Sequence, residues 1–247
     1  MGFRQAGCAP QGNGAFVSTL PSIHANSQGM KPDIKICGLK TSEAIERAVA
    51  RGASHVGFIF FPKSPRNITP EVAADLARPV RGKVKIVAVT VNADDEELDD
   101  IVQFLKPDLI QMHGDESPER LLHVRALYGV PVMKAFSIRD VSDLRRIDPY
   151  IGVADRFIFD AKAPVGSQLP GGNGVPFDWS IMASLDDHVD YMLSGGLNKD
   201  NVGLALASTR ASGVDVSSGV ESAPGVKDTE MIDAFFDAIV ANQPVRT

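Results

Sequence analysis

Short runs of β-branched and aromatic residues alternate along the chain with stretches in which apolar residues recur every three or four positions. The runs predict strands, and the second spacing predicts amphipathic helices. Strict alternation of strand and helix indicates parallel strands joined by right-handed crossovers. Eight such runs follow residue 32, at 33–37, 55–61, 85–91, 108–112, 131–136, 156–160, 190–195 and 213–218.

The segments between the runs carry helix signals of their own. Thr69 and Ser117 each precede a proline and a glutamate, which is typical of an N-cap followed by proline at the first helical position. Two other segments have one apolar face at helical spacing, which indicates helices that pack against a sheet. These faces comprise Leu98, Ile101, Val102 and Leu105 in one segment and Ile232, Phe235, Phe236 and Ile239 in the other.

Eight strand–helix units predict a single-domain (β/α)₈ TIM barrel over residues 33–247. An open, doubly wound sheet is the alternative, but it explains eight units less economically, and the first strand is not followed by G-x-G-x-x-G. In a barrel of this kind the active site is built where the strands run into the loops that follow them. We therefore expect the functional residues at the carboxyl ends of the strands.

Residues 1–32 differ from the rest of the chain. They contain no Asp or Glu up to Lys31, are rich in Gly, Ser, Asn and Pro, and show neither helical nor strand periodicity. Their apolar run is too short for a secretory signal, and Arg4 is too little basic charge for a transit peptide. We interpret them as a disordered leader, with Met30 as an alternative start of the protein.

Composition narrows the function. A formal net charge of −6 argues against a protein that binds nucleic acid or an anionic membrane surface, and favours a small-molecule partner. No apolar run approaches the roughly 20 residues of a membrane span. Cys8 and Cys37 are the only cysteines and lie in unlike contexts, which fits a reducing compartment such as the cytoplasm better than a disulfide framework.

The end of the first predicted strand combines a cysteine with a lysine. Alternation along the strand puts Ile34 and Ile36 on one face and Lys35 and Cys37 on the other, which points into the barrel. An ammonium near the thiol favours the thiolate, so we expect a lowered Cys37 pKa and a role as a base. The alternative is that Cys37 is an ordinary buried apolar residue.

Two aspartates at strand ends are candidate acids. Asp160 ends the sixth predicted strand and alternates with Phe159, so it should project into the barrel mouth. The alternative is that this carboxylate is a solvated loop residue or the cap of a following turn. Asp215 on the eighth strand also points inward, and spacing does not decide between the two. His113, after the fourth strand, is a candidate acid–base group or a structural histidine. The remaining histidines have no spacing typical of a metal site, and we expect no metal.

Glycine-rich loops follow the seventh and eighth predicted strands, where many barrels bind a phosphate. "SGGLNKDN" contains Gly195 and Gly196, and "VSSGVESAPGVKD" contains Ser218 and Gly219. A third such loop, "LPGGNG" at 169–174, follows the sixth strand and is placed to close over a ligand. Arg66, in the loop after the second strand, is a candidate to bind a carboxylate through two parallel hydrogen bonds. The alternative is an ordinary surface arginine.

Several segments together resemble one family. "KICGLKT", "GASHVGFIFFPKSPRNITPEVA", "DLIQMHGDE", "LSGGLNKDNV" and "GVDVSSGVESAPGVKD" occur in the order typical of phosphoribosylanthranilate isomerases of tryptophan biosynthesis. The resemblance extends from about Asp33 to the C-terminal helix and excludes the leader.

The resemblance implies a (β/α)₈ enzyme without metal or cofactor. It implies an Amadori rearrangement of N-(5'-phosphoribosyl)anthranilate to 1-(2-carboxyphenylamino)-1-deoxyribulose 5-phosphate. By correspondence of motifs, the resemblance implies that Cys37 is the general base and Asp160 is the general acid. It also implies that Arg66 binds the anthranilate carboxylate. The resemblance likewise implies that Gly195, Gly196, Ser218 and Gly219 bind the phosphate. We expect a monomer or homodimer.

Three alternatives keep the barrel and change the function. The related Amadori isomerase of histidine biosynthesis uses two aspartates, one of them at the position of Cys37. A pentose-phosphate epimerase would hold a metal through His and Asp ligands. A sensor or scaffold would bind a phosphorylated metabolite without converting it, because a fold alone does not establish catalysis.

Overall fold

The structure is a computed structural model that describes residues 1–2, 31–161 and 178–242. The predicted leader at 1–32 therefore lies outside the described residues except at its two ends. The predicted loop at 169–174 also lies outside them.

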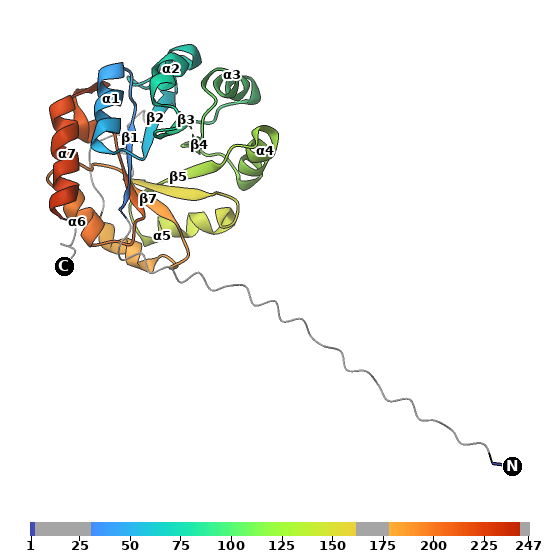
Figure 1. Cartoon of the computed structure of the whole chain (residues 1–247). Coiled ribbons are helices and arrows are strands. Elements are labelled where there is room, and N and C mark those ends of the chain that lie inside the picture. Colours follow the sequence, from blue (N-terminus) through green and yellow to red (C-terminus); the bar gives the residue numbers. More distant parts are fainter. Residues whose placement is uncertain (3–30, 162–177, 243–247) are drawn as a thin grey trace. The chain divides into compact units, whose positions relative to one another are not determined.

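Eight parallel strands close into a barrel in the order of the sequence (Figure 1). The first strand is hydrogen bonded to both the second and the eighth, with Lys35 level with His55 on one side and Asp215 on the other. This closure confirms the barrel and excludes the open sheet. The strands are β1 (Asp33–Cys37), β2 (His55–Phe60), β3 (Lys85–Thr90), β4 (Leu109–Met112), β5 (Val132–Ile138), β6 (Arg156–Ala161), β7 (Tyr191–Leu193) and β8 (Gly213–Val216).

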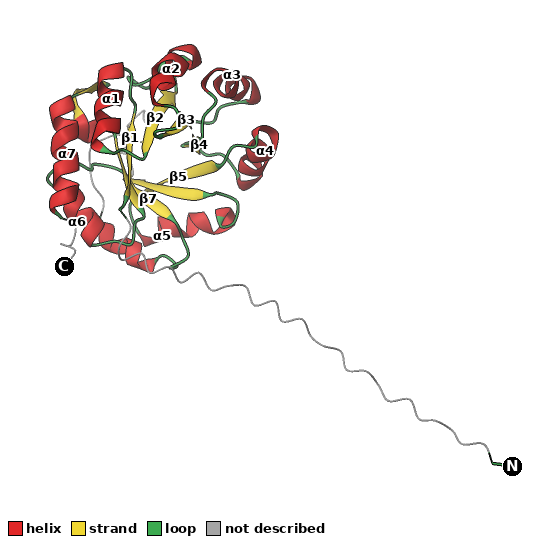
Figure 2. Ribbon diagram, viewed as in Figure 1, coloured by secondary structure: helices red, strands yellow, loops and turns green. Residues whose placement is uncertain are grey.

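Helices surround the strands (Figure 2). The two predicted N-caps are confirmed, because the Thr69 side chain accepts a hydrogen bond from the amide of Val72 and the Ser117 side chain accepts one from the amide of Arg120. The α-helices are α1 (Ser42–Arg51), α2 (Pro70–Ala77), α3 (Asp95–Leu105), α4 (Pro118–Tyr128), α5 (Val141–Leu144), α6 (Val202–Ala207) and α7 (Thr229–Ala241).

Two connections depart from the predicted pattern of strand and α-helix. After β5, the short α5 continues as a 3₁₀ helix, η2 (Arg145–Tyr150), which contains Pro149. After β6, the described part of the connection contains the 3₁₀ helix η3 (Trp179–Ser184). A further 3₁₀ helix, η1 (Arg78–Val80), follows α2.

The last two strands are shorter than predicted. β7 ends at Leu193, before Gly195 adopts a positive φ of 82° that a strand does not contain. β8 ends at Val216, and the chain then enters the 3₁₀ helix η4 (Ser218–Val220). A small antiparallel hairpin of β9 (Glu221–Ala223) and β10 (Val226–Lys227) follows. The predicted phosphate loops therefore begin earlier than the apolar pattern indicates.

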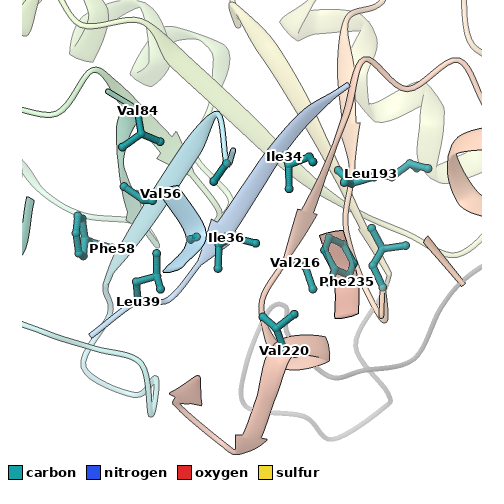
Figure 3. Packing of buried hydrophobic residues seen from close by; sticks show 14 of the residues in the cluster. Ile34, Ile36, Leu39, Val56, Phe58, Val84, Leu193, Val216, Val220 and Phe235 are labelled. Atoms are coloured by element: carbon teal, nitrogen blue, oxygen red, sulfur yellow. The ribbon is translucent and has the colours of Figure 1, made fainter. Parts of the chain in front are cut away.

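The two faces of the strands form separate apolar clusters. Outward-facing Ile34 and Ile36 pack with β2 and α7, as Figure 3 shows for Val56 and Phe235. Cys37 belongs instead to the cluster inside the barrel, which confirms the predicted alternation in β1. The inner cluster comprises Cys37, Val87, Val89, Met133, Ala135, Ile158 and Met192. The thiol thus projects from the strand that carries it into the interior.

A buried histidine lies at the start of β2. His55 is only 6% exposed, and its Nδ1 is 2.8 Å from Ser54 Oγ. Burial lowers the pKa of His55 to about 4, and the charges of Arg156 and Lys35 act in the same direction against the partial compensation from Asp33. His55 is therefore neutral in the folded protein at neutral pH.

This histidine predicts acid sensitivity of the fold. Between an ordinary pKa near 6.5 and about 4, the unfolded chain binds a proton that the folded chain does not, so stability falls as pH falls through this window. His55 alone should contribute up to about 1.4 kcal/mol per pH unit. Urea unfolding at stepped pH should show a shallower decline for His55→Gln, whereas His188→Gln, at an exposed position, should match the wild type. Identical slopes for all three proteins would contradict the assignment.

Candidate active site

A cavity opens at the carboxyl ends of the strands, where the barrel fold is expected to place its chemistry. Six of the seven predicted site residues line it: Cys37, Arg66, Asp160, Gly195, Gly196 and Ser218. Further polar groups at its wall are Ser64, Gln111, His113, Ser194, Asp215 and Ser217. Among the described residues, the apolar side chains at the wall are Ile59, Phe61, Val89, Val91, Leu197 and Val216. An apolar wall with a few polar groups is typical of a small-molecule site.

Cys37 lies above a buried ion pair. Lys35 Nζ is 2.8 Å from Asp215 Oδ1, and the lysine side chain is fully buried. Burial raises the pKa of the Cys37 thiol; Lys35 opposes this shift and Asp215 adds to it. The expectation of a lowered Cys37 pKa was therefore wrong, because Asp215 offsets the charge of Lys35 and the thiol is desolvated. At neutral pH the free protein carries mostly the neutral thiol.

Asp160 has an available oxygen at the cavity wall. The residue is 2% exposed, and its Oδ1 has no hydrogen-bond partner among the described residues. Its Oδ2 is 3.4 Å from His113 Nε2, whose ring is oriented by a contact of 3.1 Å between Nδ1 and Gln111 Nε2. A buried carboxyl oxygen without a partner beside a cavity is suited to exchange a proton or a hydrogen bond with a ligand.

Asp215 is in a different state, although it lines the same cavity. Its Oδ1 accepts a hydrogen bond from Lys35, and its Oδ2 accepts one from Ser194 Oγ at 3.3 Å. Both oxygens are thus already bonded within the protein. The geometry favours Asp160 over Asp215 as the carboxyl that meets a ligand, a choice that strand alternation left open.

The loops after β7 and β8 pack tightly against each other. Gly195 and Gly196 have consecutive positive φ values of 82° and 67°, and a Cβ on Gly195 would lie 2.6 Å from Asp160 Oδ1. A Cβ on Gly219 would lie 1.8 Å from the carbonyl oxygen of Leu197. Unlike Ser218, Gly219 is not part of the cavity wall, so its side-chain-free Cα serves the contact between the two loops.

Arg66 is held by residues that the sequence reasoning did not select. Its Nε and Nη2 donate hydrogen bonds to the two carboxylate oxygens of Glu221, each at 2.8 Å. Lys227 Nζ also donates to Glu221, at 2.5 Å. The segment that carries Glu221 and Lys227 was recognised as a motif, but nothing in it indicates a partner 155 positions earlier in the chain.

The described part of the chain has neither a membrane-spanning helix nor a group of metal-binding side chains. There, no helix has the length and apolar character needed to cross a membrane. Within residues 31–161 and 178–242, no three His, Cys, Asp or Glu side chains are grouped so as to hold a metal ion.

Comparison with known proteins extends the family resemblance. Residues 34–238 match the family model described as N-(5'-phosphoribosyl)anthranilate (PRA) isomerase. The N-(5'-phosphoribosyl)anthranilate isomerase of Agrobacterium fabrum is 71% identical over 210 residues, which cover 85% of this chain and 96% of the relative. That of Rhizobium etli strain CIAT 652 is 67% identical over 217 residues, covering 87% and 98%.

Solved structures agree with these matches. The crystal structure of phosphoribosyl anthranilate isomerase from Thermotoga maritima has a TM-score of 0.78 at 33% identity and covers 85% of this chain and 100% of its own. A phosphoribosyl anthranilate isomerase in complex with reduced 1-(o-carboxyphenylamino)-1-deoxyribulose 5-phosphate has a TM-score of 0.75 at 32% identity, with the same coverage of both chains.

Proposed function

The chain belongs to the N-(5'-phosphoribosyl)anthranilate isomerase family, whose members act in tryptophan biosynthesis, and we propose that Asp160 and Cys37 are the general acid and general base of its Amadori rearrangement. The substrate is N-(5'-phosphoribosyl)anthranilate, and the product is 1-(2-carboxyphenylamino)-1-deoxyribulose 5-phosphate. The observation that carries the residue assignment is the shared cavity, where Asp160 presents an oxygen without a partner among the described residues and Cys37 a thiol from a different strand.

The first step is the opening of the furanose ring. Asp160 donates its proton to the ring oxygen, the C1'–O bond breaks, and the nitrogen lone pair of the anthranilate forms the iminium ion. Asp160 must therefore carry a proton when the substrate binds. The side chain is almost fully buried at the cavity wall, where the ring oxygen would meet it.

The second step removes the proton from C2' of the iminium. Cys37 takes this proton as the thiolate, the C–H electrons form the C1'–C2' double bond, and the resulting enolamine tautomerises to the ketone product. One proton leaves Asp160 and one arrives at Cys37, so a transfer between the two groups through product or solvent restores the starting enzyme. Each positioned transfer contributes about 10²- to 10⁴-fold to the rate.

Two binding contacts orient the substrate between these groups. Arg66 binds the anthranilate carboxylate from the β2 side of the cavity. The phosphate lies at the loops after β7 and β8, with Gly195, Gly196 and Ser218 at the cavity wall and Gly219 behind them, where it lets the two loops meet. A solved relative is described in complex with reduced 1-(o-carboxyphenylamino)-1-deoxyribulose 5-phosphate, a compound that carries both a carboxylate and a phosphate. The protein is a monomer or homodimer; one of its structural relatives is described as dimeric.

Turnover of two aminoaldoses tests this function. The kcat/KM of the purified protein should be at least about a hundredfold higher for N-(5'-phosphoribosyl)anthranilate than for the aminoaldose of histidine biosynthesis. The reason is that Arg66 binds the anthranilate carboxylate. The gene should also restore growth without tryptophan to an auxotroph that lacks this isomerase. Preference for the histidine intermediate, or binding of either compound without conversion, would contradict the proposal.

A further inference from the structure

The hairpin after β8 carries two buried charges that the proposed mechanism does not use. The side chains of Glu221 and Lys227 are 3% and 2% exposed. Charged side chains are rarely buried to this extent unless a set of partners compensates their desolvation. The partners found here connect the hairpin to the loop that carries Arg66.

Glu221 holds one edge of the Arg66 guanidinium. The two hydrogen bonds to Nε and Nη2 form a bidentate pair, which fixes the plane as well as the position of the guanidinium. A guanidinium has five N–H groups, and this pair uses two of them. The three that remain belong to Nη1 and Nη2, at the end of the side chain, where a second carboxylate fits the fork geometry.

Backbone contacts fix the same arrangement from both sides. A Cβ on Gly38, next to Cys37, would lie 2.6 Å from Arg66 Cδ, so the arginine stem runs directly over this glycine. A Cβ on Gly225, at the hairpin turn, would lie 2.6 Å from the carbonyl oxygen of Pro65. The amide of Gly225 also donates to Glu221 Oε2 at 3.1 Å. Arg66 is therefore packed against the backbone next to Cys37, and the hairpin turn that binds Glu221 is packed against the backbone next to Arg66.

Arg66 and Lys227 together keep Glu221 ionised. Burial alone favours the neutral acid, but hydrogen bonds and charge from Arg66 and Lys227 outweigh it, and the pKa of Glu221 lies below its usual value. Lys227 Nζ donates in addition to the carbonyl oxygen of Ser217 at 2.9 Å. The three side chains sum to one positive charge, which a bound carboxylate would neutralise.

We propose that Glu221 is a positioning residue for the substrate carboxylate: it holds one edge of the Arg66 guanidinium and so directs the other edge to the cavity. This inference rests on the proposed function, which assigns the anthranilate carboxylate to Arg66. Glu221 does not touch the substrate and acts through Arg66. Selectivity for a carboxylated aminoaldose is then a property of the ion pair and not of the arginine alone.

A pair of substrates separates this role from a structural one. The probes are N-(5'-phosphoribosyl)anthranilate and N-(5'-phosphoribosyl)aniline, which lacks the carboxylate. Glu221→Gln should raise KM for the first about tenfold, as expected for the loss of one charge-assisted hydrogen bond, and change its kcat less than about threefold. For the aniline analogue, kcat/KM should stay within about threefold of the wild type. Glu230→Gln, at an exposed glutamate of α7, is the matched control and should change neither substrate.

A double-mutant cycle tests whether Glu221 acts through Arg66. In the Arg66→Ala background, Glu221→Gln should not reduce the discrimination between the two substrates any further. An additional loss there would overturn the inference. Glu221→Asp keeps the buried charge and withdraws it by one methylene, so it serves if Glu221→Gln folds poorly; its discrimination should fall at least about threefold.

The outcomes distinguish this inference from the proposed function. If the wild type converts both compounds with equal kcat/KM, the assignment of the carboxylate to Arg66 fails, and this inference fails with it. If the wild type discriminates and Glu221→Gln and Glu221→Asp discriminate equally well, or bind the carboxylated substrate more tightly, only the positioning role of Glu221 is overturned.

Discussion

Replacement of Cys37 by alanine is expected to lower kcat by about 10²- to 10⁴-fold, the range for removal of a general base. KM should change little, because the thiol contributes less to binding than the phosphate loops and Arg66. Cys37→Ser should fall nearly as far, since a serine hydroxyl is not a base near neutral pH. Steady-state kinetics with N-(5'-phosphoribosyl)anthranilate measure both parameters.

The pH profile gives this prediction a second, independent readout. Because burial raises the Cys37 pKa and the thiolate is the active form, wild-type kcat/KM should rise with pH as long as Asp160 keeps the proton that ring opening needs. Cys37→Asp, which is ionised at neutral pH, should recover part of the alanine variant's loss and show a flat profile there. Cys8→Ser removes the other cysteine, which lies before the family match, and should behave as wild type. A Cys37→Ala protein that keeps more than a tenth of the wild-type kcat would remove the thiol from the mechanism.

Replacement of Asp160 by asparagine should have an effect of the same order, a loss of about 10²- to 10⁴-fold in kcat with KM nearly unchanged. Asparagine keeps the shape of the side chain and its contact with His113 but has no acidic proton to give to the ring oxygen. The loss should therefore appear in ring opening, which a single-turnover experiment monitors by the change in anthranilate fluorescence.

Two further variants test whether the loss of kcat is specific to the Asp160 carboxyl. Asp100→Asn changes an exposed aspartate of α3 and should leave the kinetics unchanged. His113→Asn should cost clearly less than Asp160→Asn, because the imidazole orients Asp160 Oδ2 and does not supply the proton. Equal losses in the two variants would transfer the acid role to His113 or to the pair.

Much of the fold follows from local patterns in the sequence. Alternation in β1 correctly separates outward-facing Ile36 from inward-facing Cys37, and the N-caps at Thr69 and Ser117 are where the dipeptides place them. These features depend on neighbours within a few residues, and such neighbours are visible in a sequence. The ends of β7 and β8 were placed too late, because glycines and serines there interrupt strands that the apolar pattern alone would extend.

The sequence predicted which residues line the cavity, but it did not predict their ion pairs or the direction of the Cys37 pKa shift. The barrel topology brings Cys37, Asp160 and Arg66 to one cavity, as expected for residues at strand ends. Their electrostatic states depend on contacts across the barrel, such as Asp215 with Lys35 and Glu221 with Arg66, and these are separated by 180 and 155 residues. No spacing rule reaches that far, so the direction of the Cys37 pKa shift was predicted wrongly.

The closure of β1 against β8 also constrains the order in which a growing polypeptide acquires its activity. Lys35 is made early, but its counterion, Asp215, leaves the ribosome only after seven of the eight strands. Before Asp215 is available, burying the Lys35 ammonium inside the barrel would leave it without a counterion. This would destabilise the folded state by about 3–5 kcal/mol. Nascent chains that stop before β8 should therefore remain open and inactive.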